Sequence, residues 1–230
     1  TVDEWLEIKN SLSENYMLTA DLDFQNRIDP NLGNFSGVLD GNNHTISNLT
    51  STTGNGVIIG ALSGIVRNLY VENILKTNSS TYNGLIANTT SGTALIENVH
   101  VRNEKLAIAS RIGGVIGELF NGGRITNCSV TDIRLLDVST NHTKLKIGGI
   151  VGYSTDAIIE NSYVQNLKFE TDFSSFEGVG GIVGLINNGI IQNVYATGTM
   201  NVNCQNIGGI IGYSRSNLSV SNVYSNVNIH

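Results

Sequence analysis

A short motif of glycine and aliphatic residues recurs along this chain and constrains its fold more than any other feature. The motif GGIVG stands at 148–152 and again at 180–184, and close variants stand at 56–60, 113–117 and 208–212. Behind the motif come an aliphatic residue, one spacer and an asparagine. These asparagines recur about every 30 residues, as Asn68, Asn98, Asn127, Asn161, Asn193 and Asn222. A period of this length predicts a repeat architecture.

The residues within one repeat favour short β-strands. β-branched and aromatic residues form runs of about five, separated by Gly and Asn, and no run shows the helical period of about 3.6. One coil of a parallel β-solenoid has this make-up, and coils stack about 4.8 Å apart because none can bury its apolar face alone. We therefore predict an all-β chain that forms a parallel β-helix of about six to seven coils.

The repeats predict which side chains stack. One inward stack should contain Ile150, Ile182 and Ile210, with Val115, Leu85 and Val57 below them, and a second should contain Val66, Ile96, Ile125, Ile159, Ile191 and Val220. The glycine after each aliphatic pair should stand at a corner or a tight inward contact, and Ala87 should take its place in one coil. The asparagines, with Asn48 ahead of them, should line another corner. Extra residues at 133–146 and 167–178 predict loops on one side.

The first part of the chain differs from the repeats. Thr1 and Glu4 fit a capping box that opens an amphipathic helix through about Leu12, with Trp5, Leu6 and Leu12 on one face. A solenoid needs its open end covered, so we predict an N-terminal cap over 1–46 (the helix and the first strands) and β-helix repeats over 47–230. The repeat pattern runs to the last residue, so we expect the chain to be part of a longer protein.

Several blocks of the sequence resemble a known family. NYMLTADLDF, then FSGVLDGNNHTISNLT, then the glycine repeats with their I-x-N-x-Y-V segments, are similar to the GLUG-repeat regions of bacterial surface and secreted proteins. These regions include the N-terminal part of the M26 (IgA-specific) metallopeptidases. Asn43 stands where the family usually has Gly, and Asn also tolerates positive φ. The resemblance implies a right-handed β-helix at the cell surface, as a non-catalytic part of a larger protein.

Composition excludes some partners. The net charge of -6 leaves no basic stripe that could neutralise the phosphates of a nucleic acid. No apolar run is long enough to span a bilayer, so we expect no membrane insertion. Charged residues make up only 14% of the chain, which suits an extracellular or cell-surface protein. Cys128 and Cys204 lie in different parts of their coils, too far apart to form a disulfide.

Known catalytic and metal-binding motifs do not fit. The glycine motifs lead into no helix and carry no Lys-Ser/Thr, so they are not phosphate loops. No histidine belongs to an HExxH zinc motif, and we expect no cofactor or metal. Glu97 and Glu160 share one repeat position, but the coil between them has Thr126 there, so neighbouring coils pair no carboxylates as glycosidases do. Asp21 and Asp23 are too few for a calcium site.

Four tyrosines share one repeat position, namely Tyr70, Tyr163, Tyr195 and Tyr224, with His100 and Ser129 there in other coils. If the flanking residues point inward, these rings form an interrupted outward stripe that could bind a glycan or a protein, of a host or a neighbouring molecule. Alternatively, the tyrosines simply suit the exposed face of β-strands.

We predict a non-catalytic β-helical stalk, adhesive or recognition module of a larger cell-surface or secreted protein. Two alternatives stay open: a polysaccharide lyase or glycosidase built on a β-helix, and the substrate-recognition region of a secreted metallopeptidase.

Overall fold

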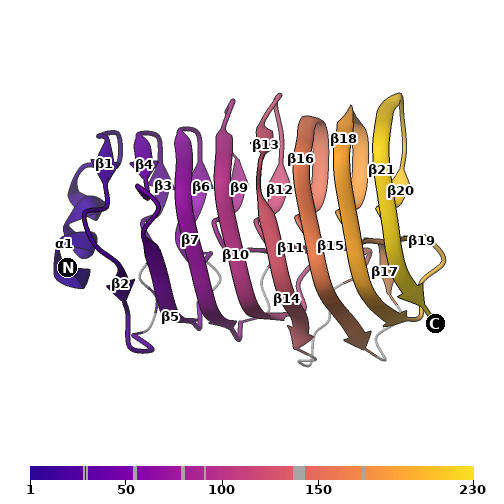
Figure 1. Cartoon of the computed structure of the whole chain (residues 1–230), viewed down its shortest axis with the longest axis horizontal. Coiled ribbons are helices and arrows are strands. Elements are labelled where there is room, and N and C mark those ends of the chain that lie inside the picture. Colours follow the sequence, from indigo (N-terminus) through magenta and orange to yellow (C-terminus); the bar gives the residue numbers. More distant parts are fainter. Residues whose placement is uncertain are drawn as a thin grey trace.

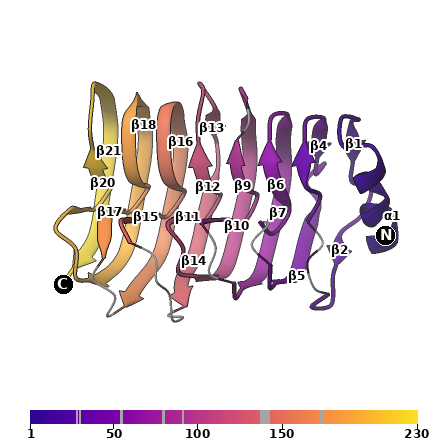
Figure 2. The ribbon, with the colours of Figure 1, turned by 180° about the vertical axis from the view of Figure 1, so that it is seen from behind.

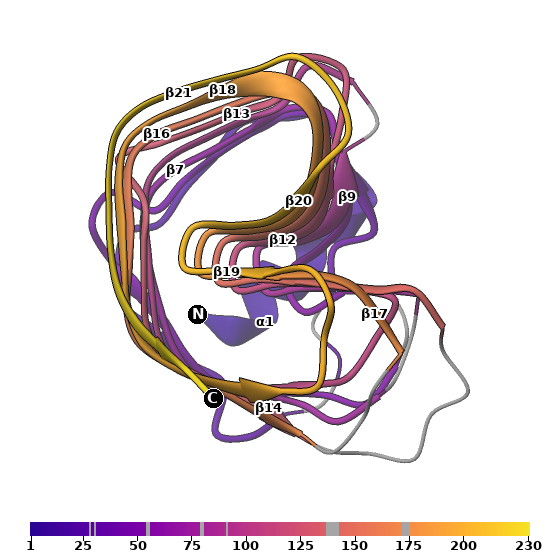
Figure 3. The same ribbon diagram turned by 90° about the vertical axis from the view of Figure 1, so that its right-hand side faces the viewer.

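The protein folds into a parallel β-solenoid of about 6 turns, closed at one end by a short helix (Figure 1). The computed structural model describes residues 1–27, 29, 31–53, 56–78, 81–90, 92–136, 143–171 and 175–230. Seen from the C-terminal end (Figure 3), the chain runs counterclockwise from β19 through β20 to β21 as it approaches the viewer, which is a right-handed coil. The predicted all-β, right-handed fold is confirmed.

Each coil has a long-strand side and an inward fold. The long-strand side is built from β4 (Val38–Asp40), β5 (Thr45–Ser51), β7 (Ile65–Lys76), β10 (Leu95–Ala107), β13 (Arg124–Thr126), β14 (Ser129–Leu136), β16 (Val151–Thr171), β18 (Val183–Val202) and β21 (Leu218–Ile229). They belong to one 16-stranded sheet whose described pairings are all parallel.

The inward fold, which we call the hook, joins two further sets of strands (Figure 3). The strands before its turn form a separate five-stranded sheet of β8 (Tyr82–Gly84), β11 (Arg111–Gly113), β15 (Leu145–Gly148), β17 (Phe176–Gly180) and β19 (Ile207–Gly208). Figure 2 shows β11, β15 and β17 side by side along the solenoid. The strands after the turn are β3 (Asn34–Phe35), β6 (Ile59–Leu62), β9 (Ala87–Thr90), β12 (Ile116–Leu119), β20 (Ile211–Ser214) and the first residues of β16 and β18.

The register confirms the second predicted stack completely. Val66, Ile96, Ile125, Ile159, Ile191 and Val220 are partners on successive coils. All are fully buried except Val220, which is 42% exposed in the last coil, where no further coil covers it. These aliphatic side chains therefore form one continuous core ladder.

The first predicted stack is right in four coils and wrong in two. Ile150, Ile182 and Ile210 stack on Val115, because β12, β16, β18 and β20 pair in that register. Ala87, however, pairs with Ile59 and Ile116, which puts Ile86 and Ile58 in this stack instead of Leu85 and Val57. Ala87 consequently lies at an aliphatic position, and the position of the last glycine belongs to Asn88.

The glycines of the motif allow the hook to cross the interior. A Cβ on Gly181 would lie 2.1 Å from the carbonyl oxygen of Gly209 and 2.6 Å from Cβ of Ala196 on the long strand. A Cβ on Gly184 would lie 2.5 Å from the backbone nitrogen of Ile147, in the sheet before the hook. Real Cβ atoms do not make contacts this short, so Gly181 at the hook tip and Gly184 in the return strand have no room for a side chain. The predicted tight inward contact is confirmed.

Two ladders of asparagine line the corners of the long-strand side. The predicted asparagines all have φ between 50° and 57°. Hydrogen bonds between their side-chain amides join neighbouring coils, such as the 3.0 Å bond that Asn98 donates to Asn68. The prediction for Asn48 is wrong. Its side chain accepts a hydrogen bond from Asn73, which belongs to a second ladder. This ladder lies five residues after the first in each coil and contains Asp23, Asn48, Asn73, Asn103, Asp132 and Asn166. Asn tolerates this left-handed backbone and its amide can satisfy the next coil.

A helix covers the N-terminal end of the core. In α1 (Val2–Glu7) Thr1 and Glu4 form the predicted capping box, and a 3₁₀ turn follows at Ile8–Asn10. Trp5 is buried and meets Phe24 edge-on at 5.9 Å. Leu6 was predicted on the apolar face, but it is 39% exposed, whereas Ile8 in the following 3₁₀ turn is buried.

The sheet continues through the predicted domain boundary. β1 (Tyr16–Met17) pairs with β4, and β2 (Leu22–Asp23) pairs with β5, so strands within 1–46 already belong to the solenoid ladder. The boundary at 46 and 47 stays a prediction. Of the two predicted loops, 137–142 and 172–174 lie outside the described residues. Cys128 and Cys204 are both free thiols, as expected.

Candidate functional site

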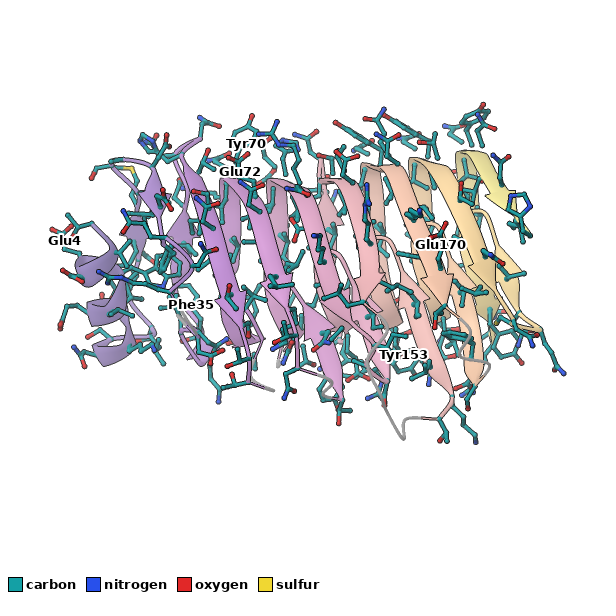
Figure 4. All side chains as sticks on the ribbon, turned by 90° about the horizontal axis from the view of Figure 1, so that it is seen from below. Glu4, Phe35, Tyr70, Glu72, Tyr153 and Glu170 are labelled. Atoms are coloured by element: carbon teal, nitrogen blue, oxygen red, sulfur yellow. The ribbon has the colours of Figure 1, made fainter. Side chains whose placement is uncertain are left out.

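The register brings the predicted tyrosines into one column on the outward face of the long strands. Partners on successive coils are Thr45, Tyr70, His100, Ser129, Tyr163, Tyr195 and Tyr224, which we call the outer ring row. The residues on either side of this position, such as Leu69 and Val71, are buried, so alternation along the strand turns the row outward. Tyr70 points away from the solenoid beside Glu72 in Figure 4.

The rings of the row stack in two pairs. Tyr163 and Tyr195 lie parallel, with an interplanar angle of 1° and ring centroids 4.8 Å apart. Tyr70 and His100 lie 5.1 Å apart and are tilted by 34°. The parallel pair has the spacing of adjacent strands, so its ring faces are directed along the axis of the solenoid.

The row is interrupted at Ser129, between the two pairs. A cleft of about 530 Å³ runs along the row past this gap, from Asn43 and Thr45 at one end to Tyr163 at the other, with Tyr70, His100 and Ser129 among its lining residues. The Ser129 hydroxyl lies 2.8 Å from Nδ1 of His100, and Nε2 of His100 lies 3.1 Å from the Asn98 side-chain oxygen. The cleft thus has rings on both sides and hydrogen-bonding groups at its base.

A second outward column forms the rim of this cleft. It contains Ser47, Glu72, Arg102, Thr131 and Gln165, two residues further along each strand than the ring row. Arg102 forms an ion pair with Glu72 on the neighbouring coil. The pair balances its own charge, and the guanidinium is 66% exposed, so its remaining N–H groups face solvent. The rim is polar without a net charge.

Burial sets the charge state of His100. Because the ring is half-buried between its neighbours, desolvation lowers the pKa of His100 below its ordinary value. A neutral imidazole, with one nitrogen as donor and the other as acceptor, therefore occupies this position at neutral pH.

The hook carries a second group of tyrosines on the opposite side of the molecule, as the positions of Tyr70 and Tyr153 in Figure 4 show. The Arg111 guanidinium lies over the rings of Tyr82 at 4.9 Å and Tyr153 at 5.4 Å, and forms a 3.0 Å ion pair with buried Glu118. We call this region the hook cleft. Sequence reasoning missed it, because the pairing depends on how the hook folds back.

The hook cleft continues as an ionic network toward the C-terminal end. Lys146 contacts Glu177 at 2.7 Å, and Arg215 pairs with the same carboxylate. Burial, with Arg111 and Arg215 nearby, lowers the pKa of Lys146 to about 8. Tyr153 receives a 2.7 Å hydrogen bond from Asn187 at its hydroxyl. The charged and aromatic groups of this cleft are thus engaged with one another.

The carboxylates considered from the sequence do not assemble into a catalytic pair among the described residues. The register puts Thr126 between Glu97 and Glu160, as predicted. Burial raises the pKa of Glu160, but hydrogen bonds from Arg124 and Gln192 outweigh it and hold that pKa below its ordinary value. Such a carboxylate stays ionised at neutral pH and is a poor general acid.

The two aspartates considered for calcium serve local structure. Asp21 accepts a 2.9 Å bond from the backbone of Thr45, and Asp23 accepts bonds from Gln25 and Asn48. Within the part of the chain that the structure describes, no group of three or more His, Cys, Asp or Glu side chains could hold a metal ion.

Comparison with known proteins supports the repeat assignment. The GLUG motif family matches residues 108–135, which span β11, β12, β13 and most of β14 and include Ser129. No match is found among curated proteins. The motif and the solenoid together fit a β-helical module of a larger protein. In the described ranges, no helix combines the length and the hydropathy that a membrane span requires.

Proposed function

We propose that this chain is a non-catalytic recognition module of a larger cell-surface or secreted protein, and that the outer ring row is its binding surface. The observation that carries the proposal is the column of outward rings held in register across successive coils. Tyr70, Tyr163 and Tyr195 each stand on a strand that is paired on both sides, so this part of the surface is rigid before a ligand arrives.

The type of side chain supports a role in binding. Tyrosine has a large apolar ring and a polar hydroxyl, and it loses little conformational entropy when a ligand fixes it. Tyr70, which has neighbouring coils on both sides, is 43% exposed although it is a large aromatic side chain. The low charge content of the chain also favours contacts through rings, hydroxyls and amides over charge attraction.

Binding to an array of cell-surface polysaccharides and glycoproteins tests the proposal. We expect the chain to bind at least one component, and the variant Tyr70→Ala/Tyr163→Ala/Tyr195→Ala to lose at least ten-fold in affinity. The matched control is Tyr213→Ala, which removes an exposed ring from the hook side and should bind like the parent. An unchanged affinity of the triple variant, or loss in the Tyr213 variant alone, would overturn the assignment of the surface.

Two alternative functions have distinct outcomes. A polysaccharide lyase or glycosidase would release fragments from acidic or neutral polysaccharides with turnover, whereas we expect binding without release. A substrate-recognition region of a metallopeptidase would bind a protein substrate of that enzyme, and the sequence of a longer parent chain would contain HExxH.

A further inference from the structure

We propose that the gap at Ser129 is a slot for one pyranose ring of an uncharged glycan. We call the space over Ser129, between His100 and Tyr163, the ring slot. This inference rests on the proposed function, because it names the class of ligand that the outer ring row takes.

The height of the slot follows from the spacing of the coils. His100 and Tyr163 are two strands apart, which corresponds to about 10 Å along the axis. Van der Waals contact of about 3.5–4.0 Å on each face of an inserted ring uses about 7–8 Å of this. The remainder matches the puckered chair of a pyranose with its axial hydrogens, and exceeds what a flat aromatic ring fills.

The walls of the slot present the surfaces that such a ring needs. Tyr163 is parallel to Tyr195, so its other face is directed toward the coil of Ser129. On the far side stands His100, supported by Tyr70 and kept neutral by its burial. The C–H groups on one face of a pyranose are apolar and carry a slight positive charge, and the face of an aromatic ring is negative.

The base and rim can bond the hydroxyl groups around a sugar. Ser129, which is 4% exposed and hydrogen-bonded to His100, lies at the base, and Thr131 on the same strand lies at the rim. The ion pair of Arg102 and Glu72 provides both donors and acceptors at the rim. Because the one cation and the one anion of the lining pair with each other, the site favours an uncharged sugar over a carboxylated one.

A peptide is a poorer fit to the same place. Peptides that bind sheets do so by hydrogen-bonding to an unpaired edge strand. The long strand β10 pairs with both β7 and β14, so its backbone groups are already bonded between coils. A ligand here must be recognised through side chains alone, and the ring slot supplies the ring face of Tyr163 and the tilted imidazole of His100.

The substitution Ser129→Tyr tests the slot, because it completes the ring row and fills the gap. We expect the parent to bind at least one uncharged oligosaccharide of glucose, galactose, mannose or N-acetylglucosamine in calorimetric titration, and S129Y to lose at least ten-fold in affinity. Ser221→Tyr adds the same ring at an exposed position in the last coil and is the matched control, expected to bind like the parent. Ser129→Ala keeps the slot and should lose about two- to five-fold.

Thermal unfolding of each variant by circular dichroism shows that it has folded, and Tyr163→Ala offers a second route by removing one wall. If folded S129Y binds as tightly as the parent, the ring slot is wrong although the outer ring row can still be the binding surface. If no uncharged oligosaccharide binds the parent while the triple tyrosine variant loses an acidic polysaccharide or a protein ligand, the sugar class is wrong and the proposed function stands. Unchanged binding in the triple variant contradicts the proposed function itself.

Discussion

Tyrosines line this solenoid on two sides, and their neighbours use them differently. In the hook cleft, Tyr82 and Tyr153 enclose the Arg111 guanidinium, which pairs with buried Glu118. In the outer ring row, Tyr163 and Tyr195 stack on each other, and the row of rings is interrupted at Ser129. The same residue type thus stabilises the fold on one side and leaves ring faces open on the other. An exposed tyrosine alone does not indicate a binding site. The contacts of each ring determine whether its face is free to bind a ligand.

The largest expected effect breaks the hook itself. In Gly181→Val, the added side chain would collide with the backbone of Gly209 and with Ala196 on the long strand. We expect no cooperative thermal unfolding transition in circular dichroism. The control is Gly92→Ala, whose Cβ would make an ordinary 3.5 Å contact with Ser63 and should leave the transition unchanged. A folded Gly181→Val protein would show that the hook does not cross the interior.

The ion pairs of the two sides should differ in strength. Arg111→Met leaves Glu118, which is 3% exposed, without its main partner, and should cost about 2–4 kcal/mol in the free energy of unfolding. Arg102→Met removes the corresponding partner of Glu72 on the outer face and should cost at most about 1 kcal/mol. Urea unfolding measures both. Equal costs would contradict the division into a structural side and an open side.

A buried carboxyl on the inward side of β10 tests the contrast within one strand. Glu104 is fully buried between Ile74 and Ile133, and neither of its carboxyl oxygens has a well-formed hydrogen bond. Burial raises the pKa of Glu104 well above its ordinary value, and the nearby backbone of Arg102 offsets only part of this. The folded state then holds a proton that the unfolded state has lost, so the contribution of Glu104 to stability falls as the pH rises above the ordinary glutamate range.

The variant Glu104→Leu should remove the loss of stability that Glu104 causes as the pH rises. At pH 7 we expect it to be about 1–3 kcal/mol more stable than the parent, and the gain should shrink as the pH falls to about 4. Urea unfolding across this pH range is the measurement, with exposed Glu97→Leu as the control. A gain that grows toward acid pH would mean that Glu104 is ionised and paired in the fold.

The corner between the two faces should show an intermediate effect. Asn98 has φ of 52°, donates to Asn68 and accepts from Asn127. Asn98→Ala combines a left-handed backbone with the loss of these bonds and should cost about 1–2 kcal/mol. Asn98→Gly keeps the backbone relaxed and should cost less than the alanine variant. The reverse order in urea unfolding would show that backbone conformation is not what selects asparagine here.

The smallest effect is expected in the outer ring row. Tyr224→Ala removes a ring that is 61% exposed, and should change the free energy of unfolding by less than about 0.5 kcal/mol. Tyr153→Ala, in the hook cleft, removes contacts with Arg111, Lys146 and Asn187 and should cost clearly more. Similar costs in the two variants would remove the distinction on which the proposed binding surface rests.

The sequence predicted features that depend on a residue's place within one repeat. The ladder of Val66 and Ile96, the asparagine corner and the column of tyrosines all follow from alignment of the coils, because stacked coils place equal positions side by side. The second asparagine ladder carried a signal as well, since Asn73 and Asn103 end two successive repeats, but it was not separated from the first. Asn48 was therefore assigned to the first asparagine ladder, although it belongs to the second.

Features that depend on the path of the chain between repeats were not predictable in the same way. The segment GLIAN at 84–88 has two glycines fewer than GGVIG, and alignment on Ala87 shifted the stack by one residue. The ion pair of Arg111 and Glu118 depends on the hook folding back on itself. The glycines of the motif permit this path, but their pattern in the sequence does not predict it. The ring slot is different again. The sequence shows Ser129 in a column of rings, and the register shows that rings stand on both sides of it.

The eight tyrosines of this chain allow a direct test of where a ligand binds. We would label the tyrosine rings with ¹³C and titrate the protein with an uncharged oligosaccharide while recording the ring signals by NMR. We expect shifts for Tyr163, which forms one wall of the ring slot, and for Tyr70, which supports His100 at the other wall, and none for Tyr82, Tyr153 and Tyr213 on the hook side. Shifts confined to the hook tyrosines, or no shift of Tyr163 at saturating ligand, would contradict this expectation.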